Sequence, residues 1–159
     1  MKKKFILLLF VLIIMTSVYF KSKSFISVSD NPRIVLISAD YKKNSKMETL
    51  DISGDEISNE LNEELIKILA NAKIRNKILP YQGSHSIEDG DTHIDIKVAV
   101  ENNPSIFIHI CNEQQYSIVM IKDRYYSFSH SDVVFEKIYQ SIFNPVSYTH
   151  LTLPTTPYV

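Results

Sequence analysis

The densest group of potential metal ligands lies in the polar loop over residues 80–92 and at the residue just after it. Its candidate ligands are His85, Asp89, Asp91 and His93. Asp89 and Asp91 flank a glycine and could place two carboxylates around a hard cation, while the two histidines suit zinc. The further oxygen ligands and the closing glutamate of a calcium loop are missing, however, and so is a zinc-binding HExxH helix. We therefore expect an ordinary polar loop without a bound metal or cofactor, and we keep a metal site as the alternative.

A histidine and a cysteine lie two residues apart on one predicted strand. His109 and Cys111 would share a face of that strand, and a Cys–His pair can form a reactive thiolate. Same-face neighbours point in parallel, however, which is a poor geometry for proton transfer, and cysteine is commonly buried. We interpret both residues as structural. The three glycines, Gly54, Gly83 and Gly90, are isolated, so no phosphate loop or nucleophile elbow is formed, and no enzymatic activity is expected.

Aromatic residues gather on one predicted hairpin near the end of the chain. Tyr116, Tyr125 and Tyr126 could form a recognition surface for a sugar or a protein partner. Tyrosines also favour strands and pair well across them, so packing within the sheet is the competing interpretation. A recognition surface is the strongest functional hypothesis that the motifs offer.

Composition narrows the class of protein. The chain has 159 residues, of which 45% are hydrophobic and 22% charged, as expected for one globular domain. Once the three N-terminal lysines are set aside, 14 basic residues face 18 acidic ones, a net charge of −4. Such a domain repels nucleic acid. The single cysteine allows no internal disulfide and no Cys-based zinc site.

The N-terminus has the pattern of a targeting segment. Three lysines precede an apolar run over residues 5–20, and Lys21 and Lys23 follow it. This charge layout is typical of an export signal or a signal anchor. It predicts a single-pass protein at the cell membrane with the C-terminal domain outside, and secretion after signal cleavage is the alternative. No lipobox cysteine is present.

The C-terminus looks foreign to the domain. Residues 146–155 resemble a translated sequencing-library adapter, and Pro154 and Pro157 break both helix and strand. We therefore divide the chain into four parts: residues 1–24 as membrane anchor or signal peptide, 25–32 as tether, 33–144 as a small α+β domain, and 145–159 as a non-native tail.

Alternating and helical patterns predict the elements of that domain. Strands are expected over 33–41, 93–100, 106–111, 116–121 and 124–129, with a possible short strand at 47–52. One helix is expected from Ile57 to Ala72, with Ser53 and Glu56 spaced as a capping box, and a second is expected to end at Phe143. The predicted fold is α+β: a three- to five-stranded antiparallel meander with two helices on one face, preceded by an N-terminal transmembrane or signal helix.

This layout resembles small membrane-anchored extracytoplasmic proteins of unknown function from low-GC Gram-positive bacteria. The resemblance covers residues 33–143 and rests on loose patterns in residues 69–73, 93–96 and 125–126. It implies a location and a topology, and it assigns no functional residues.

The expected function is a non-enzymatic binding or accessory module of the cell envelope. Its expected partners are the membrane, through residues 5–20, and another envelope protein, with no nucleic acid. Two alternatives remain open. One is a metal-dependent envelope protein or enzyme that uses the 85–93 loop, and the other is the N-terminal fragment of a longer protein.

Overall fold

The structure, a computed structural model, describes residues 2–19, 21–27, 30–77, 87–101, 103–113 and 116–144. These residues form a seven-stranded sheet, with every neighbouring pair antiparallel, in the order β2-β1-β4-β5-β6-β7-β3. The strands are β1 (Arg33–Lys43), β2 (Lys46–Ser53), β3 (Ile74–Asn76), β4 (Thr92–Val100), β5 (Asn103–Cys111), β6 (Ile118–Ile121) and β7 (Arg124–Phe128).

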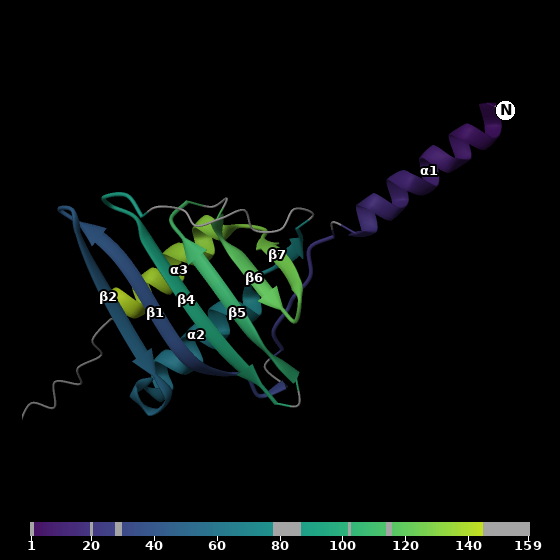
Figure 1. Cartoon of the computed structure of the whole chain (residues 1–159). Helices are drawn as coiled ribbons and strands as arrows, with labels where there is room; N and C mark the ends of the chain where they lie inside the picture. Colours follow the sequence, from purple (N-terminus) through teal and green to yellow (C-terminus); the bar gives the residue numbers. More distant parts are fainter. Residues whose placement is uncertain are drawn as a thin grey trace, which may run out of the picture.

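Two helices cover one face of this sheet and leave the other open. They are α2 (Asn59–Asn71) and α3 (Ser131–Phe143), which pack against each other behind the strands in Figure 1. The short 3₁₀ helix η2 (Gly54–Glu56) links β2 to α2. Among the described residues, the helix α1 (Lys2–Tyr19) extends away from the sheet, so no helix lies over the second face.

The core lies between the sheet and the two helices. Alternate residues of each central strand point toward the helices, as the period of two requires, and Ile94, Ile96 and Ile108 are at most 1% exposed. Leu69 of α2 and Ile138 of α3 are fully buried against this layer. Because each such side chain contributes roughly 1.5–3 kcal/mol on burial, the helices hold the sheet firmly and fix which residues face outward.

The start of α2 is set by a cap that lies five residues later than the predicted one. Ser58 is the N-cap, and its hydroxyl accepts a hydrogen bond from the backbone N–H of Leu61 at 3.2 Å. The predicted capping pair is present, since the backbone N–H of Ser53 donates to Glu56 at 3.2 Å, but it opens η2 instead. The α2 helix therefore begins at Asn59.

The α+β class is confirmed, but the predicted sheet of three to five strands with two helices is wrong. The described residues form seven strands and three α-helices. The number of strands was underestimated because β3 has only three residues. Ile74 is the single buried residue among them, which is too few to show a period of two. The edge strand β2, expected only as a possible short strand at 47–52, has no buried residue, so its pattern is equally weak.

The prediction of a single-pass location at the cell membrane is also wrong. Within the described ranges, no helix is both long enough and apolar enough to cross a bilayer. Three of the 18 residues of α1 are lysines, and the remaining 15 extend over only about 22 Å. The apolar interior of a bilayer is about 30 Å thick.

Phe25 and Ile26, predicted as part of the tether, pack on the domain. Ile26 is 6% exposed and belongs to the core, and the ring of Phe25 contacts that of Phe128 edge-on, with centroids 5.9 Å apart. Just before them, Lys23 pairs with Ile74 as an isolated antiparallel bridge. The predicted tail, residues 145–159, lies outside the described residues.

Candidate functional site: the open face of the sheet

The strand register places the outward side chains in rows that run across the open face. One row, here called the apolar row, consists of Leu36, Lys97, Phe107, Met120 and Tyr125, taken from β1, β4, β5, β6 and β7 in turn. The next row, here called the polar row, consists of Ser38, Asp95, His109 and Ile118. Residues that are far apart in the sequence thus become neighbours on one surface.

A shallow groove of about 240 Å³ runs between these two rows, and we call it the open-face groove. Its apolar lining comes from Leu36, Phe107, Ile118 and Met120. Phe107 is 44% exposed and Leu36 is 36% exposed, although both side chains are large and hydrophobic. The groove therefore leaves apolar surface in water, which favours a partner that can cover it.

Lys97 supplies an uncompensated positive charge at the groove. Its ammonium lies 5.3 Å from the centroid of the Phe107 ring, a cation–π contact. Of the carboxylates in the described part of the chain, none forms an ion pair with Lys97. The second cation of the groove is His109, and the carboxylate of Asp95 balances its charge.

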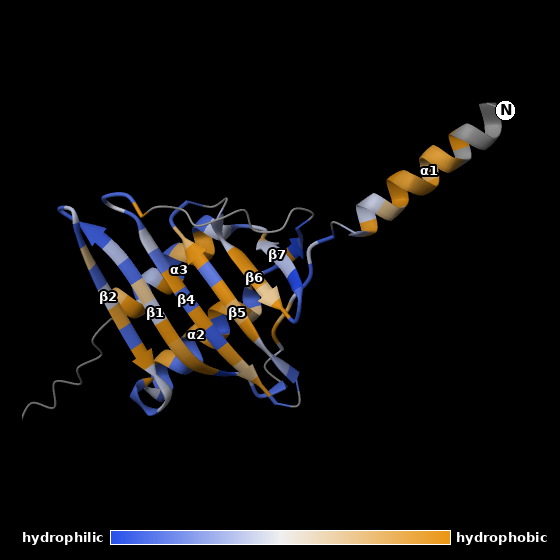
Figure 2. Ribbon diagram, in the orientation of Figure 1, coloured by the Kyte–Doolittle hydropathy of each residue, from blue (hydrophilic) through white to orange (hydrophobic). Residues whose placement is uncertain are grey.

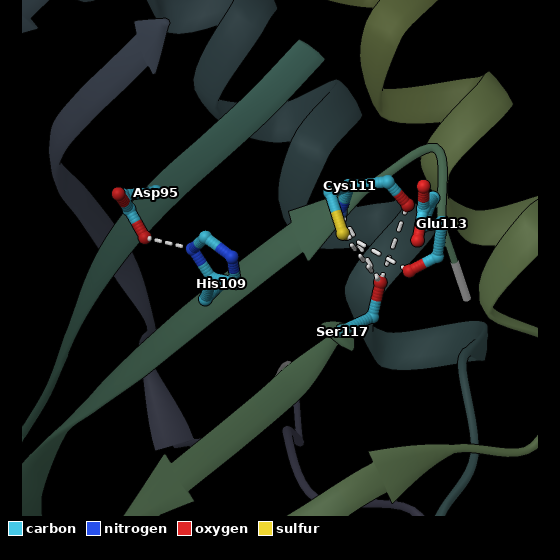
Figure 3. A network of polar contacts seen from close by, with 5 residues as sticks. All are labelled: Asp95, His109, Cys111, Glu113 and Ser117. Atoms are coloured by element: carbon cyan, nitrogen blue, oxygen red, sulfur yellow. Dashed lines mark hydrogen bonds and ion pairs between the residues drawn. The ribbon is translucent and has the colours of Figure 1, made fainter. Parts of the chain in front are cut away.

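Asp95 and His109 form the main polar contact of the groove. The Nδ1 atom of His109 lies 2.8 Å from Oδ1 of Asp95 on the neighbouring strand (Figure 3). The hydrogen bond to Asp95, followed by that to the thiol of Cys111, raises the pKa of His109 to about 9, while burial opposes the rise. His109 is therefore charged at neutral pH, and its ion pair with Asp95 links side chains of β4 and β5 at the groove.

Cys111 is buried at the end of β5, on the sheet face that also carries His109. It is 1% exposed, and its S–H donates to the backbone carbonyl of Glu113 at 3.0 Å. The Ser117 hydroxyl accepts from the backbone N–H of Cys111 at 3.1 Å, and these contacts of Cys111 lie away from the carboxylate of Asp95 in Figure 3. A catalytic nucleophile must meet its substrate, so a buried thiol that donates to a backbone carbonyl is a packing residue.

The predicted metal ligands are engaged in holding a turn. Both carboxylate oxygens of Asp89 accept from the backbone N–H of Ser45, at 2.8 and 3.1 Å. Asp91 accepts from the backbone N–H of Glu88 at 2.8 Å and is 8% exposed. His93 is also 8% exposed and contacts the ring of His109 edge-on. His85 lies outside the described residues, and the described ones contain no cluster of three or more metal-ligating side chains.

The structure does not bring the three predicted tyrosines onto one surface. Tyr126 points into the core and is 6% exposed, whereas Tyr125 stands on the opposite face at the end of the apolar row. Tyr116 is half-buried and precedes β6. Of the three, Tyr125 alone belongs to a row that lines the groove.

A larger groove of about 1,060 Å³ lies between α2 and α3, but its chemistry is that of two solvated helix faces. Its acidic side chains include Glu60, in the first turn of α2, where a carboxylate stabilises the helix dipole. Glu64 accepts a hydrogen bond from the hydroxyl of Ser141 at 2.8 Å, which ties the two helices together. These carboxylates therefore have structural roles.

The groove residues Leu36, Asp95, Lys97, Phe107 and Met120 were missed as site residues in the sequence. The turn between β4 and β5 supplies only part of the signal that would have found them, because it pairs Val100 with Asn103 but a β-bulge lies between Val98 and Val100. The bulge shifts the register by one residue and so places Asp95 opposite His109, whereas the turn alone would place it opposite Ile108. A comparison of the chain with family models, curated proteins and solved structures found no match.

Proposed function

We propose that the domain is a non-enzymatic binding module whose open-face groove holds a short apolar segment of a partner protein that carries an acidic residue. The observation that carries this proposal is the exposure of Phe107 and Leu36 on a sheet face that α2 and α3 leave uncovered. Large apolar side chains on an open surface are a common feature of recognition sites.

The size of the groove favours protein side chains over a small molecule. At about 240 Å³ and with an open top, it is smaller than pockets that enclose drug-sized ligands, which measure about 300–1,000 Å³. It can receive a few anchoring side chains from a partner. Such anchors contribute most of the affinity of many protein interfaces.

The charge of the groove favours an acidic neighbour beside those anchors. Asp95 and His109 neutralise each other, so Lys97 remains as the cation that an incoming carboxylate can pair with. Partial burial under the partner would strengthen this ion pair relative to an exposed one. We expect the acidic residue to govern selectivity and the apolar anchors to supply most of the binding energy.

The test is a selection of octapeptides displayed on phage against the folded full chain and three variants. The wild-type protein is expected to enrich peptides with large apolar residues and an aspartate or glutamate. Lys97→Glu is expected to reverse the charge preference toward lysine and arginine, and Phe107→Ala to weaken binding of the wild-type peptides by about tenfold or more. Val133→Ala on α3 is the matched control, because Val133 is 48% exposed on the helical layer.

Three outcomes would overturn the proposal. They are a selection that enriches no sequence, enriched peptides whose charge preference is the same for wild type and Lys97→Glu, and peptides that bind Phe107→Ala as tightly as wild type. The resemblance to small extracytoplasmic proteins of low-GC Gram-positive bacteria stays a prediction.

A further inference from the structure

The helix α1 exposes apolar side chains around its whole circumference. The eight consecutive residues 8–15 are all hydrophobic, and each is at least 46% exposed. Eight residues make more than two turns of an α-helix, so they point in every direction around the axis. Figure 2 accordingly shows the middle of α1 in orange, with a paler turn nearer the domain, on a helix that stands clear of the domain. This surface is independent of the open-face groove.

We propose that α1 binds a lipid bilayer by inserting into its apolar interior, without crossing it. A groove on a protein covers one face of a helix and would leave the remaining apolar side chains in water. A lipid phase covers all faces at once, as an all-round apolar helix requires. The inference concerns what surrounds α1 and does not depend on a partner for the groove.

The hydroxyl of Thr16, in the apolar part of α1, is compatible with an apolar surrounding. The hydroxyl of Thr16 donates to the backbone carbonyls of Leu12 and Ile13, at 3.0 and 2.9 Å. A hydroxyl that is satisfied within its own helix enters lipid at a lower cost than one that needs water.

The C-terminal end of α1 is hydrogen-bonded to the domain at the β3 edge of the sheet. The side-chain amide of Asn76 donates to the backbone carbonyl of Tyr19 at 2.6 Å. Lys23 and Ile74 exchange two backbone hydrogen bonds of 2.8 Å each. These contacts place the β3 edge next to the point where α1 would enter the lipid.

The same edge carries a group of cations, which we call the basic collar. Its members are Lys21, Lys23, Arg75 and Lys77, within a chain that is net negative once the N-terminal lysines are set aside. Lys23 lies 4.5 Å from the centroid of the Tyr126 ring, and Lys21, Lys23 and Arg75 are exposed. Cations beside an inserted helix attract anionic headgroups, each by about 1 kcal/mol. The collar therefore favours a bilayer that contains anionic lipid.

Flotation of the full chain with vesicles tests the inference. Vesicles of phosphatidylcholine alone and of phosphatidylcholine with a minority of phosphatidylglycerol are mixed with the protein and floated through a sucrose gradient. The protein is expected to float with both and to bind the anionic vesicles more tightly. Leu9→Asp combined with Ile13→Asp is expected to weaken partition by at least about a hundredfold, because two apolar side chains that lipid would bury are replaced by charged ones. Neither side chain belongs to the core, so the domain stays folded.

Two further variants separate the contributions. Val133→Asp, an equally exposed apolar position on α3, is expected to float like wild type. Arg75→Glu with Lys77→Glu is expected to remove the preference for anionic vesicles and to keep the binding to neutral ones. The inference is overturned if wild type stays at the bottom of the gradient, or if the Leu9→Asp/Ile13→Asp variant floats equally well. It is also overturned if wild type forms oligomers through α1 that persist with vesicles present.

Discussion

The ion pair between Asp95 and His109 should make the stability of the domain depend on pH in a way that one substitution removes. The pKa of His109 is raised from 6.5 to about 9 in the folded protein. Because the folded pKa lies above the unfolded one, the stabilisation is complete below about pH 6.5 and is lost as the pH rises through about 9.

The size of the effect follows from the two pKa values and from the exposure of the partners. The interval between 6.5 and about 9 corresponds to at most about 3 kcal/mol. The side chain of His109 is 20% exposed, but that of Asp95 is 57% exposed, so solvent screens the pair. We therefore expect a contribution of about 1–2 kcal/mol.

Urea unfolding at about pH 6 and about pH 9.5 measures this contribution. Asp95→Asn keeps the shape of the side chain and removes its charge, so the wild type should lose about 1–2 kcal/mol more than the variant between the two pH values. The matched control is Asp51→Asn, since Asp51 lies on the same face and accepts from Ser38 instead of a histidine. The other titratable groups that face His109, Cys111 and His93, are unchanged in both variants. Identical pH dependence of wild type and Asp95→Asn would refute the reasoning.

Four further predictions follow from single contacts. Ser58→Ala should cost about 1 kcal/mol of unfolding free energy and Ser53→Ala clearly less, because only Ser58 caps an α-helix of full length. The thiol of Cys111 should react with a thiol reagent only after unfolding, since it is 1% exposed; reaction in the native state would contradict its structural role. Ile138→Ala should cost about 2–5 kcal/mol in thermal or urea unfolding, because Ile138 is fully buried. Chelator should leave the melting temperature unchanged, whereas Asp89→Asn should lower it through the lost charge-assisted bonds to Ser45.

The central strands could be predicted from the sequence because their inward residues alternate without interruption. The isoleucines of β5, Ile106, Ile108 and Ile110, are at most 4% exposed, as a half-buried strand requires. At the edges of the sheet this signal fails. β3 is held by its pairing with β7 and by Lys23, and these are tertiary contacts that no local pattern encodes.

The candidate site could be predicted only in part, because it depends on the register between strands. The sequence places His109 and Cys111 on one face of a strand, and the register confirms that they share it with Phe107. What the sequence did not show is the neighbour across the strand. Asp95 is 14 residues away in the chain, and its contact with His109 exists only because β4 and β5 pair in this register.

The most direct test of the open-face groove is nuclear magnetic resonance mapping of a selected acidic, apolar octapeptide on the labelled full chain. Amide shifts are expected to concentrate at Leu36, Lys97, Phe107 and Met120 and to leave α2 and α3 unchanged. Shifts that concentrate on α2 and α3, or that persist at the same peptide concentration in Phe107→Ala, would contradict the proposed binding surface.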